Sequence, residues 1–243
     1  MALALELIRP PAPLSFADGL ALQQQLFDRI LAARAANAEF GGGVILLEHT
    51  PTITLGRESA VQDLLASEAT LRAQGIAVET TDRGGKITVH APGQWVLYPV
   101  LDLNRFGRSV TGHIRNLEEV AIRAAARFGV PAERIAGVSG AWVRSPGAQR
   151  STDSGGAPAR EEKLAAVGIA VRRWIVRHGL CFNVAADMPV YKFIVPCGQL
   201  ERGVTSLQKL IGRRDTAALM AESAAALLTE LETVLDVRFR APD

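Results

Sequence analysis

Short apolar segments of two kinds divide the chain, and their order limits the folds that it can adopt. Some have the two-residue alternation or the continuous apolar run of strands, and others repeat apolar residues every three or four positions. The strand-like segments come in runs, with the helical ones grouped between them, rather than in strict alternation. This order favours an α+β fold: a mixed, largely antiparallel sheet with flanking helices.

The helical segments have recognisable starts and stops. Ser15 can cap a helix over 15–37, and Asp18 lies favourably in its first turn. Gly129 and Pro131 end a second long helix. We expect helices at 15–37, 109–128 and 216–235, and shorter ones near 67–74 and 206–211.

The strand-like segments are short and bounded by Gly, Pro or Asp. Adjacent strands at 163–171 and 173–184 should form a hairpin or part of a meander. Residues 145–160 are small and polar, which indicates a mobile surface loop inside one domain that spans 1–243. We expect an irregular segment at 187–200 and further strands at 44–48, 52–55, 76–80, 95–103, 134–135, 141–143 and 237–240, with another between the turns of 82–94.

Composition excludes several classes of protein. The 243 residues carry a net charge of +2, which is too mild for a nucleic-acid binder. No apolar run is long enough to span a membrane, and the first ten residues lack a basic signal-peptide start. We therefore expect a cytoplasmic protein. Its two cysteines should remain thiols there, and its four scattered histidines give no metal signature.

Cys197 is the sharpest candidate for chemistry. It lies between Pro196, which fixes the backbone, and Gly198, which lets a substrate approach closely. A thiolate in such a loop could be a nucleophile, although an inert cysteine in a tight turn fits the same three residues. Cys181 lies within an apolar strand and is better explained as a small core residue.

Three further features could serve a reaction, and each also has a plain structural explanation. Lys163 opens an apolar strand and could act as a base if it points into a pocket. The turn Arg83-Gly84-Gly85 could offer backbone N–H groups to an anion or a carbonyl oxygen. His90 could donate to a substrate carbonyl, although a structural histidine is the default expectation.

Several motifs stand in a fixed order along the chain. Together they make it resemble the lipoyl(octanoyl) transferase family, the octanoyl-[acyl-carrier-protein]–protein octanoyltransferases. The resemblance runs from about Val44 to Leu207. It is carried by His49-Thr50-Pro51 through Gly56-Arg57, Arg83-Gly84-Gly85 through Gln94 with Tyr98-Pro99, Gly140-Ala141-Trp142-Val143, Lys163 through Ile169, His178-Gly179-Leu180, and Pro196-Cys197-Gly198 with Val204-Thr205-Ser206-Leu207.

The resemblance implies the fold of the biotin and lipoate protein ligase catalytic domains. It implies that Cys197 carries an octanoyl thioester and that Lys163 activates this cysteine. Cys181 stands where the family usually has alanine. The segments that would line the acyl pocket are Arg83, Gly84, Gly85, Lys86, Ile87, Thr88, Val89 and His90, then Ala166, Val167 and Gly168, then Gly179, Leu180 and Cys181.

The resemblance also implies the partners. The donor would be octanoyl-acyl-carrier protein, and the acceptors would be lipoyl domains of 2-oxoacid dehydrogenase complexes and the glycine cleavage H protein. Arg202, Arg213 and Arg214 could meet these acidic partners. No metal, cofactor, nucleic acid or membrane is expected, and the protein should be a monomer. The alternatives are an ATP-dependent lipoate or biotin ligase on the same fold, and a non-catalytic carrier-protein binding module.

Overall fold

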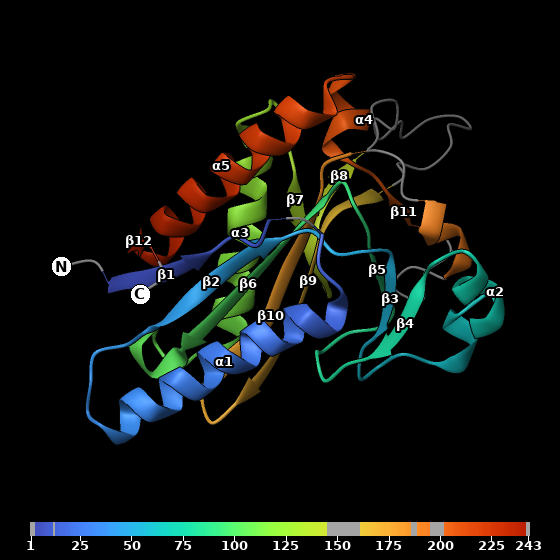
Figure 1. The fold of residues 1–243 in the computed structure, drawn as a ribbon. Coiled ribbons are helices and arrows are strands. Elements are labelled where there is room, and N and C mark those ends of the chain that lie inside the picture. Colours follow the sequence, from blue (N-terminus) through green and yellow to red (C-terminus); the bar gives the residue numbers. More distant parts are fainter. Residues whose placement is uncertain (1–2, 12, 145–160, 186–188, 195–201, 242–243) are drawn as a thin grey trace.

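A computed structural model describes residues 3–11, 13–144, 161–185, 189–194 and 202–241. Within these residues, nine strands form one sheet in the order β12-β1-β2-β6-β10-β9-β8-β7, with β11 paired to β9 (Figure 1). The strands are β1 (Leu3–Ile8), β2 (Gly42–Leu47), β6 (Gln94–Asp102), β7 (Glu133–Ile135), β8 (Val138–Arg144), β9 (Glu161–Arg172), β10 (Ile175–Asn183), β11 (Gly203–Val204) and β12 (Val237–Arg240).

The sheet is mixed and largely antiparallel. Among the described strands of this sheet, only the pairs of β1 with β2 and with β12, and of β11 with β9, run parallel. A second sheet of three strands has the order β4-β3-β5, formed by β3 (Thr52–Leu55), β4 (Ala77–Thr80) and β5 (Thr88–His90). Together with the helices, this is the α+β fold that the order of segments predicts.

Each long helix begins at a capping side chain. Ser15 accepts from the Asp18 N–H ahead of α1, and Ser109 accepts from the Gly112 N–H ahead of α3. The helices are α1 (Phe16–Ala35), α2 (Glu68–Ala73), α3 (Val110–Ala126), α4 (Leu207–Ile211) and α5 (Thr216–Leu235), with 3₁₀ turns at Val61–Asp63, Leu103–Arg105 and Pro189–Phe193. None of the helices in the described chain has the length and apolarity needed to cross a bilayer.

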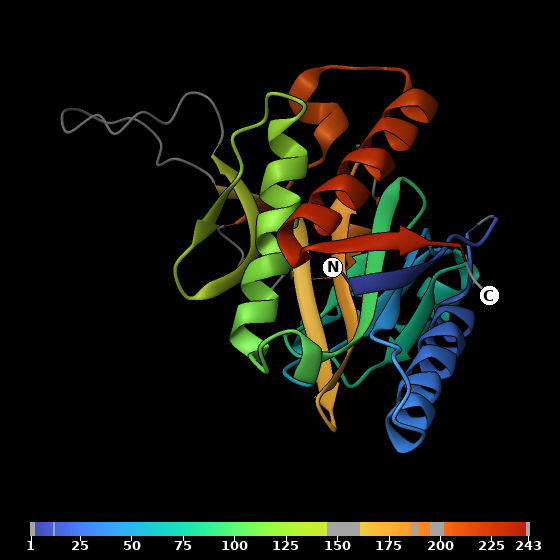
Figure 2. The same ribbon diagram turned by 90° about the vertical axis from the view of Figure 1, so that its left-hand side faces the viewer.

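The helices cover the two faces of the large sheet unequally. Alternate residues of β2 point to opposite faces, as a strand requires. Val44 and Leu46 pack in the cluster that includes α3 and α5, whereas Ile45 and Leu47 pack in the cluster that includes α1. Figure 2 shows α3 and α5 crossing one face of the sheet while α1 lies on the other. On the face of the large sheet that carries α1, the part that the helix leaves uncovered faces the small sheet.

The expected helices and strands are confirmed, with two additions. Residues 163–171 and 173–184 form the predicted hairpin, with β9 and β10 antiparallel in register. Its turn, Arg173-Trp174, has positive φ at both residues, as a two-residue hairpin turn requires. The additional strands are β1 and β11. The segments 145–160 and most of 187–200 lie outside the described residues.

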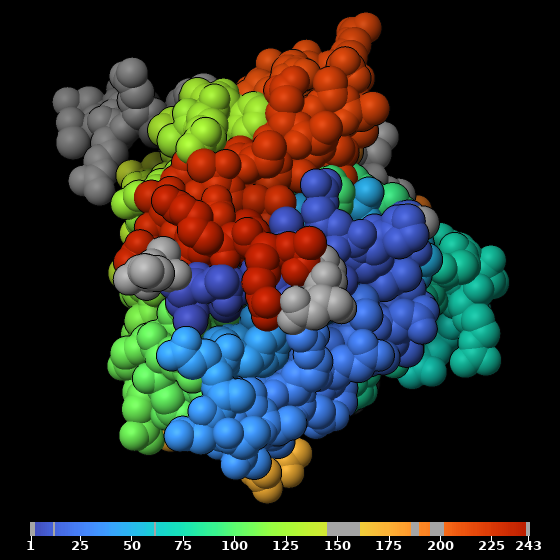
Figure 3. Space-filling view, turned by 60° about the vertical axis from the view of Figure 1, so that its left-hand side comes forward, coloured from blue at the N-terminus to red at the C-terminus, as the bar shows by residue number. Residues whose placement is uncertain are grey.

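β1 was missed because Glu6 interrupts its apolar run. The structure buries Glu6 and pairs its carboxylate with Arg29 of α1 at 2.6 Å. β1 lies between β2 and β12, so the first and last described strands are neighbours. Figure 3 shows this face, where the blue N-terminal strand and the red C-terminal strand meet. The expected edge strand 237–240 therefore completes the sheet.

His113 of α3 makes the fold sensitive to acid. Its side chain is buried, and neither ring nitrogen has a hydrogen-bond partner within the described residues. Burial lowers the pKa of His113 to about 4, while an unfolded histidine titrates near about 6.5. Between these values the unfolded chain binds the extra proton, so stability falls as the pH falls through this window.

We expect His113→Leu to remove this part of the acid sensitivity. Relative to the wild type, the variant should gain about 2–3 kcal/mol between about pH 7.5 and pH 4.5, from the difference between the two pKa values. Urea denaturation at several pH values measures this gain. If the two stability curves stay parallel across the window, His113 is protonated as easily in the folded protein as in the unfolded one.

Candidate active site

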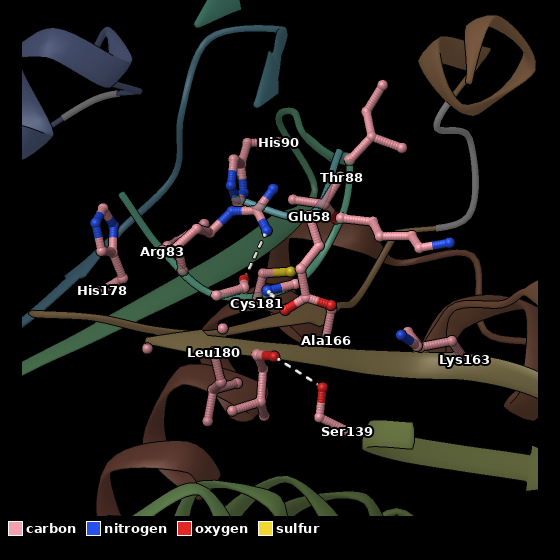
Figure 4. A pocket seen from close by; sticks show the side chains of 18 of the residues that line it. Glu58, Arg83, Thr88, His90, Ser139, Lys163, Ala166, His178, Leu180 and Cys181 are labelled. Atoms are coloured by element: carbon pink, nitrogen blue, oxygen red, sulfur yellow. Dashed lines mark hydrogen bonds between the residues drawn. The ribbon is translucent and has the colours of Figure 1, made fainter. Parts of the chain in front are cut away.

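A cavity of about 350 Å³ opens between the large and the small sheet. Its walls come from β6, β9 and β10 on one side and from the loop before β5 on the other, with Phe16 at the start of α1 (Figure 4). Thirteen of the fourteen residues expected to line an acyl pocket lie around it, and so does Lys163. They are Arg83, Gly84, Gly85, Lys86, Ile87, Thr88, His90, Ala166, Val167, Gly168, Gly179, Leu180 and Cys181.

Val89 is the exception, so its expected place in the pocket is wrong. Val89 is fully buried and packs with Ile53 and Leu71 behind the small sheet. Successive residues of a strand point to opposite faces, so Thr88 and His90 face the cavity while Val89 between them faces away.

An irregularity in β9 turns Lys163 into the cavity. Ala165 lies opposite Ala141 of β8, but Lys163 lies opposite Trp142, so β9 has one residue more than its partner over this step. Strict alternation would place Lys163 on the same face as Ala165, which packs toward α3 and α5. The extra residue reverses the alternation, as β-bulges do, and Lys163 lines the cavity together with Ala166.

The segment 204–205 fixes the backbone of Lys163, and Trp142 contacts its side chain. The Lys163 carbonyl accepts a hydrogen bond from Thr205 N–H at 3.0 Å, and Val204 of β11 lies opposite it in the sheet. Its side chain is 9% exposed, and Nζ lies 4.5 Å from the ring centre of Trp142. Lys163 is therefore a buried amine at a defined place in the cavity wall rather than a solvated strand end.

Cys197 lies outside the described residues, so its distance from Lys163 is not part of this geometry. Cys181 is described: it is buried, belongs to β10 and lines the cavity. It also packs in the apolar cluster beneath α1. The expectation that Cys181 is a small core residue is confirmed, and the cavity wall is part of that core.

The loop with Arg83 is held by its own hydrogen bonds. Arg83 Nη2 donates to the Thr54 carbonyl at 2.8 Å and to Thr54 Oγ1 at 2.9 Å. Gly84 N–H donates to the Ile169 carbonyl at 2.9 Å, which ties the loop to β9. A Cβ on Gly168 would lie 3.0 Å from the Gly84 carbonyl, so glycine permits this close approach.

This geometry changes the expected role of the Arg83-Gly84-Gly85 turn. Gly85 N–H donates to Glu58 Oε1 at 3.1 Å, and Gly84 N–H is engaged with β9. Neither amide is directed to a carbonyl oxygen in the cavity. The turn therefore acts as a wall of the cavity, held on one side by Arg83 and on the other by Glu58.

Side chains behind the cavity fix the tautomer of His90. Gln94 Nε2 donates to the Val89 carbonyl at 3.2 Å and to Asn183 Oδ1 at 2.9 Å. Gln94 Oε1 must then accept from His90 Nδ1, 2.9 Å away. Burial lowers the pKa of His90 well below its usual range, so its Nε2 carries no proton at neutral pH. His90 cannot donate to a substrate carbonyl in this form.

The same network reaches the backbone of Lys163. Asn183 is 2% exposed, and its Nδ2 donates to the Thr205 carbonyl at 3.0 Å. The Lys163 carbonyl lies 3.5 Å from the same nitrogen. A buried chain of hydrogen bonds thus runs from the cavity to the end of β11 through His90, Gln94 and Asn183.

Two of the four histidines, His90 and His178, line the inner wall of the cavity, and His49 lies behind it against Tyr98. His49 Nε2 lies 2.9 Å from the Tyr98 hydroxyl and Nδ1 lies 3.0 Å from the Leu14 carbonyl. Burial lowers the pKa of His49 to about 4 and raises the pKa of Tyr98 above its usual range. The neutral His49 therefore donates to Leu14 and accepts from Tyr98. The described residues contain no group of three His, Cys, Asp or Glu side chains that could hold a metal.

His178 closes the far end of this wall. Its Nε2 lies 2.8 Å from Asp82 Oδ1, and its backbone N–H donates to Gln23 Oε1 at 2.7 Å. Burial lowers the pKa of His178 despite the opposing effect of Asp82. The hydrogen bond from His178 in turn lowers the pKa of the Asp82 carboxyl.

Several cavity residues were not predicted. Val138 and Ser139 lie at the cavity because β8 pairs with β9, and no local sequence pattern predicts this pairing. Tyr98 belongs to a recognisable motif, and Phe16 follows the predicted cap at Ser15, so their segments could be found but not their orientation. The unpredicted lining residues are Phe16, Glu58, Val96, Tyr98, Gly137, Val138, Ser139 and His178.

The arginines expected to meet acidic partners are mostly paired within the chain. Arg202 Nε lies 3.1 Å from Glu161, and Arg213 forms two hydrogen bonds with Glu222. Arg214 is exposed. This surface is therefore less basic than a count of arginines suggests.

Comparison with known proteins shows to which family the chain belongs. Residues 15–232 match the model of the lipoyl protein ligase A/B catalytic domain. An octanoyltransferase of Chloroflexus aggregans is 40% identical over 211 residues, which are 86% of this chain and 88% of that protein. One of Acidobacterium capsulatum is 39% identical over 202 residues, covering 80% of this chain and 76% of that protein. The chain belongs to the octanoyltransferase family.

Solved structures support the fold of this octanoyltransferase family member. A bipartite lipoate protein ligase from Thermoplasma acidophilum superposes with a TM-score of 0.62 at 14% identity, covering 100% of this chain and 87% of that one. Lipoate-protein ligase A bound with ATP gives 0.61 at 15% identity, covering 100% and 89%. The expected ligase-like fold is confirmed. The relatives also make the chain an acyltransferase that acts in octanoyl transfer for lipoylation, so the binding-module alternative is wrong.

Gly179 tests the packing of the cavity wall. A Cβ there would lie 2.1 Å from the Leu97 carbonyl and 2.7 Å from Pro99 Cδ, so β10 and β6 would have to separate. Gly179→Ala should lower the free energy of unfolding by roughly 3 kcal/mol. Gly84→Ala is the matched control, because its Cβ would meet Ile169 O at an ordinary 3.5 Å. Equal urea midpoints for both variants would contradict the tight contact at Gly179.

Proposed function

We propose that the protein transfers an octanoyl group from octanoyl-acyl-carrier protein to the target lysine of a lipoyl domain, through a thioester on Cys197. The acceptors would be lipoyl domains of 2-oxoacid dehydrogenase complexes and the glycine cleavage H protein, in the cytoplasm, and the enzyme would act as a monomer. The observation that carries this proposal is the buried Lys163 amine in the wall of a cavity of about 350 Å³.

In the first half-reaction, Lys163 Nζ accepts the proton of the Cys197 thiol, and the thiolate attacks the donor carbonyl carbon. The bond between that carbon and the carrier sulfur breaks, and the carrier thiolate takes the proton back from Lys163. In the second half-reaction, the acceptor amine attacks the thioester and Lys163 accepts its proton. The bond to Cys197 sulfur then breaks, and an amide is formed.

The cavity suits the acyl chain better than a charged group. Ala166, Val167, Leu180 and Cys181 supply apolar wall on one side. The histidines and Tyr98 on the inner wall are neutral, because burial disfavours their charged forms. A neutral, internally hydrogen-bonded wall can bury hydrocarbon without leaving a charge uncompensated.

The proposed thioester also separates this reaction from that of an ATP-dependent ligase. A ligase would activate a free fatty acid with ATP, whereas a transferase takes the acyl group from a thioester. Intact-mass measurement after mixing with octanoyl-carrier protein distinguishes them: an octanoyl adduct without ATP supports the transferase, and an adduct that requires ATP supports the ligase.

The two thiols should differ in this experiment. Cys197→Ala should form no octanoyl adduct and lose transfer, with little effect on folding, because only the proposed nucleophile is removed. Cys181→Ala should keep most of the activity, because Cys181 contributes packing to the cavity wall. Full transfer by Cys197→Ala, measured by mass gain of the lipoyl domain, would end the covalent mechanism.

Lys163→Arg tests whether Lys163 moves protons. Arginine keeps the charge but does not release its proton in a protein. If Lys163 serves as general acid and base in both half-reactions, Lys163→Arg and Lys163→Ala should each lower the transfer rate by about a hundred- to ten-thousand-fold. Rates come from single-turnover acylation and deacylation. An Arg variant with near-normal rates would leave Lys163 as a fixed charge only.

A further inference from the structure

Trp142 of β8 is the side chain that the bulge in β9 places beside Lys163. The two residues lie opposite each other across β8 and β9. Directly opposed side chains share one face of a sheet, so the indole is on the cavity face with the lysine. Lys163 Nζ lies 4.5 Å from the Trp142 ring centre, within the range of a cation–π contact.

The ring is held firmly in this position. Trp142 is 1% exposed and is among the largest fully buried side chains in the described residues. Its neighbours along β8, Ala141 and Val143, point to the opposite face and pack in the main core. A fully buried ring on a strand that is paired on both edges cannot follow a moving lysine, so the contact fixes where the lysine amine lies.

A second cation contacts the same ring. Arg202 Cζ lies 5.3 Å from the Trp142 ring centre, and Arg202 Nε is paired with Glu161 of β9. Arg202 follows Cys197 by five residues in the sequence and precedes β11, which pairs with β9 at Lys163. Trp142 is therefore the common contact of the proposed base and of the chain that returns from the proposed nucleophile.

We propose that Trp142 is a positioning residue for acyl transfer: its ring holds the Lys163 amine at a fixed place in the cavity wall. The inference rests on the proposed function, since it assigns Trp142 a role through the Lys163 base. An amine displaced by even a small distance would no longer be within hydrogen-bond reach of the thiol, which a proton transfer requires.

Other charged and titratable groups also face this region, and the experiment must account for them. They come from β5 and the loop before it, from the segment after β3, from β6 to β10, and from the residue before β11. These groups are Glu58, Arg83, Lys86, His90, Tyr98, Glu133, Arg144, Glu161, His178, Cys181 and Arg202.

Two substitutions separate the role of the ring from that of its bulk. Trp142→Leu removes the aromatic face, whereas Trp142→Phe keeps a smaller one. Trp142→Leu should slow both half-reactions by about 30-fold, the effect of losing a desolvated cation–π contact, and Trp142→Phe should slow them less. The affinity for octanoyl-carrier protein should not change, because Trp142 does not line the cavity.

Trp95→Leu is the matched control. Trp95 packs against the main core on the other face of the sheet, and its Nε1 donates to the Met220 carbonyl at 2.8 Å. Its loss should lower the melting temperature without slowing either half-reaction. If Trp95→Leu slowed them as much as Trp142→Leu, general destabilisation would explain the effect and the positioning role would be overturned.

The pH profile of Cys197 alkylation by iodoacetamide, followed by peptide mass, separates this inference from the proposed function. Lys163→Ala should shift the profile to higher pH, and Trp142→Leu should shift it in the same direction by a smaller amount. If Lys163→Ala leaves the profile unchanged, the proposed cysteine–lysine pair fails and the inference fails with it. If Lys163→Ala shifts the profile but Trp142→Leu and Trp142→Phe do not, only the inference is overturned.

A spectroscopic measurement checks the contact itself. The chain has four lysines, so NMR of protein labelled with ¹³C-lysine gives few signals. The signal that disappears in Lys163→Arg is that of Lys163. The ring current should move the Lys163 ε-CH₂ proton signal upfield in the wild type. Trp142→Leu should abolish this shift and Trp142→Phe should reduce it. A Lys163 signal at the random-coil position in the folded wild type would overturn the proposed contact.

Discussion

The one-residue irregularity between β8 and β9 is the constraint on which the candidate site depends. With strict alternation along β9, the Lys163 side chain would point into the core beneath α3 and α5, and the Leu164 side chain would face the cavity. The extra residue puts the amine in the cavity while leaving Leu164 and Ala165 in that core. The pairing with Trp142, the junction with β11 and the hydrogen bonds from Asn183 and Thr205 all follow from this reversal.

The inner wall of the cavity shows how a polar lining can surround hydrocarbon. His49, His90 and Tyr98 are buried, yet each has a defined hydrogen-bond partner behind the wall. The partners are the Leu14 carbonyl for His49, the His49 ring for Tyr98 and the Gln94 amide for His90, so the polar atoms that bind them are satisfied within the protein. The wall is thus polar but uncharged at neutral pH, because burial disfavours the charged forms of these groups.

Sequence periodicity predicts most of the secondary structure because it reflects local burial. Capping serines, glycine stops and the β9–β10 hairpin are confirmed for this reason. It fails where burial depends on distant residues: β1 contains a buried Glu6, which is tolerated because Arg29 of α1 pairs with it. For the candidate site, motif order identifies the segments, but not orientation. Val89 was misplaced by one step of alternation, and Trp142 lies beside Lys163 because of a bulge that the sequence does not reveal.

The adjacency of β1 and β12 has a consequence for how the protein is made. β1 is paired on both edges only when Val237–Arg240 is present, because β12 supplies its second neighbour. A nascent chain on the ribosome therefore exposes one edge of a central sheet until residue 240 has emerged, some 230 residues after β1. Contacts between such distant segments slow folding and leave strand edges open to mispairing. Biosynthesis of this fold thus has a late closing step, at which chaperones or truncations would act.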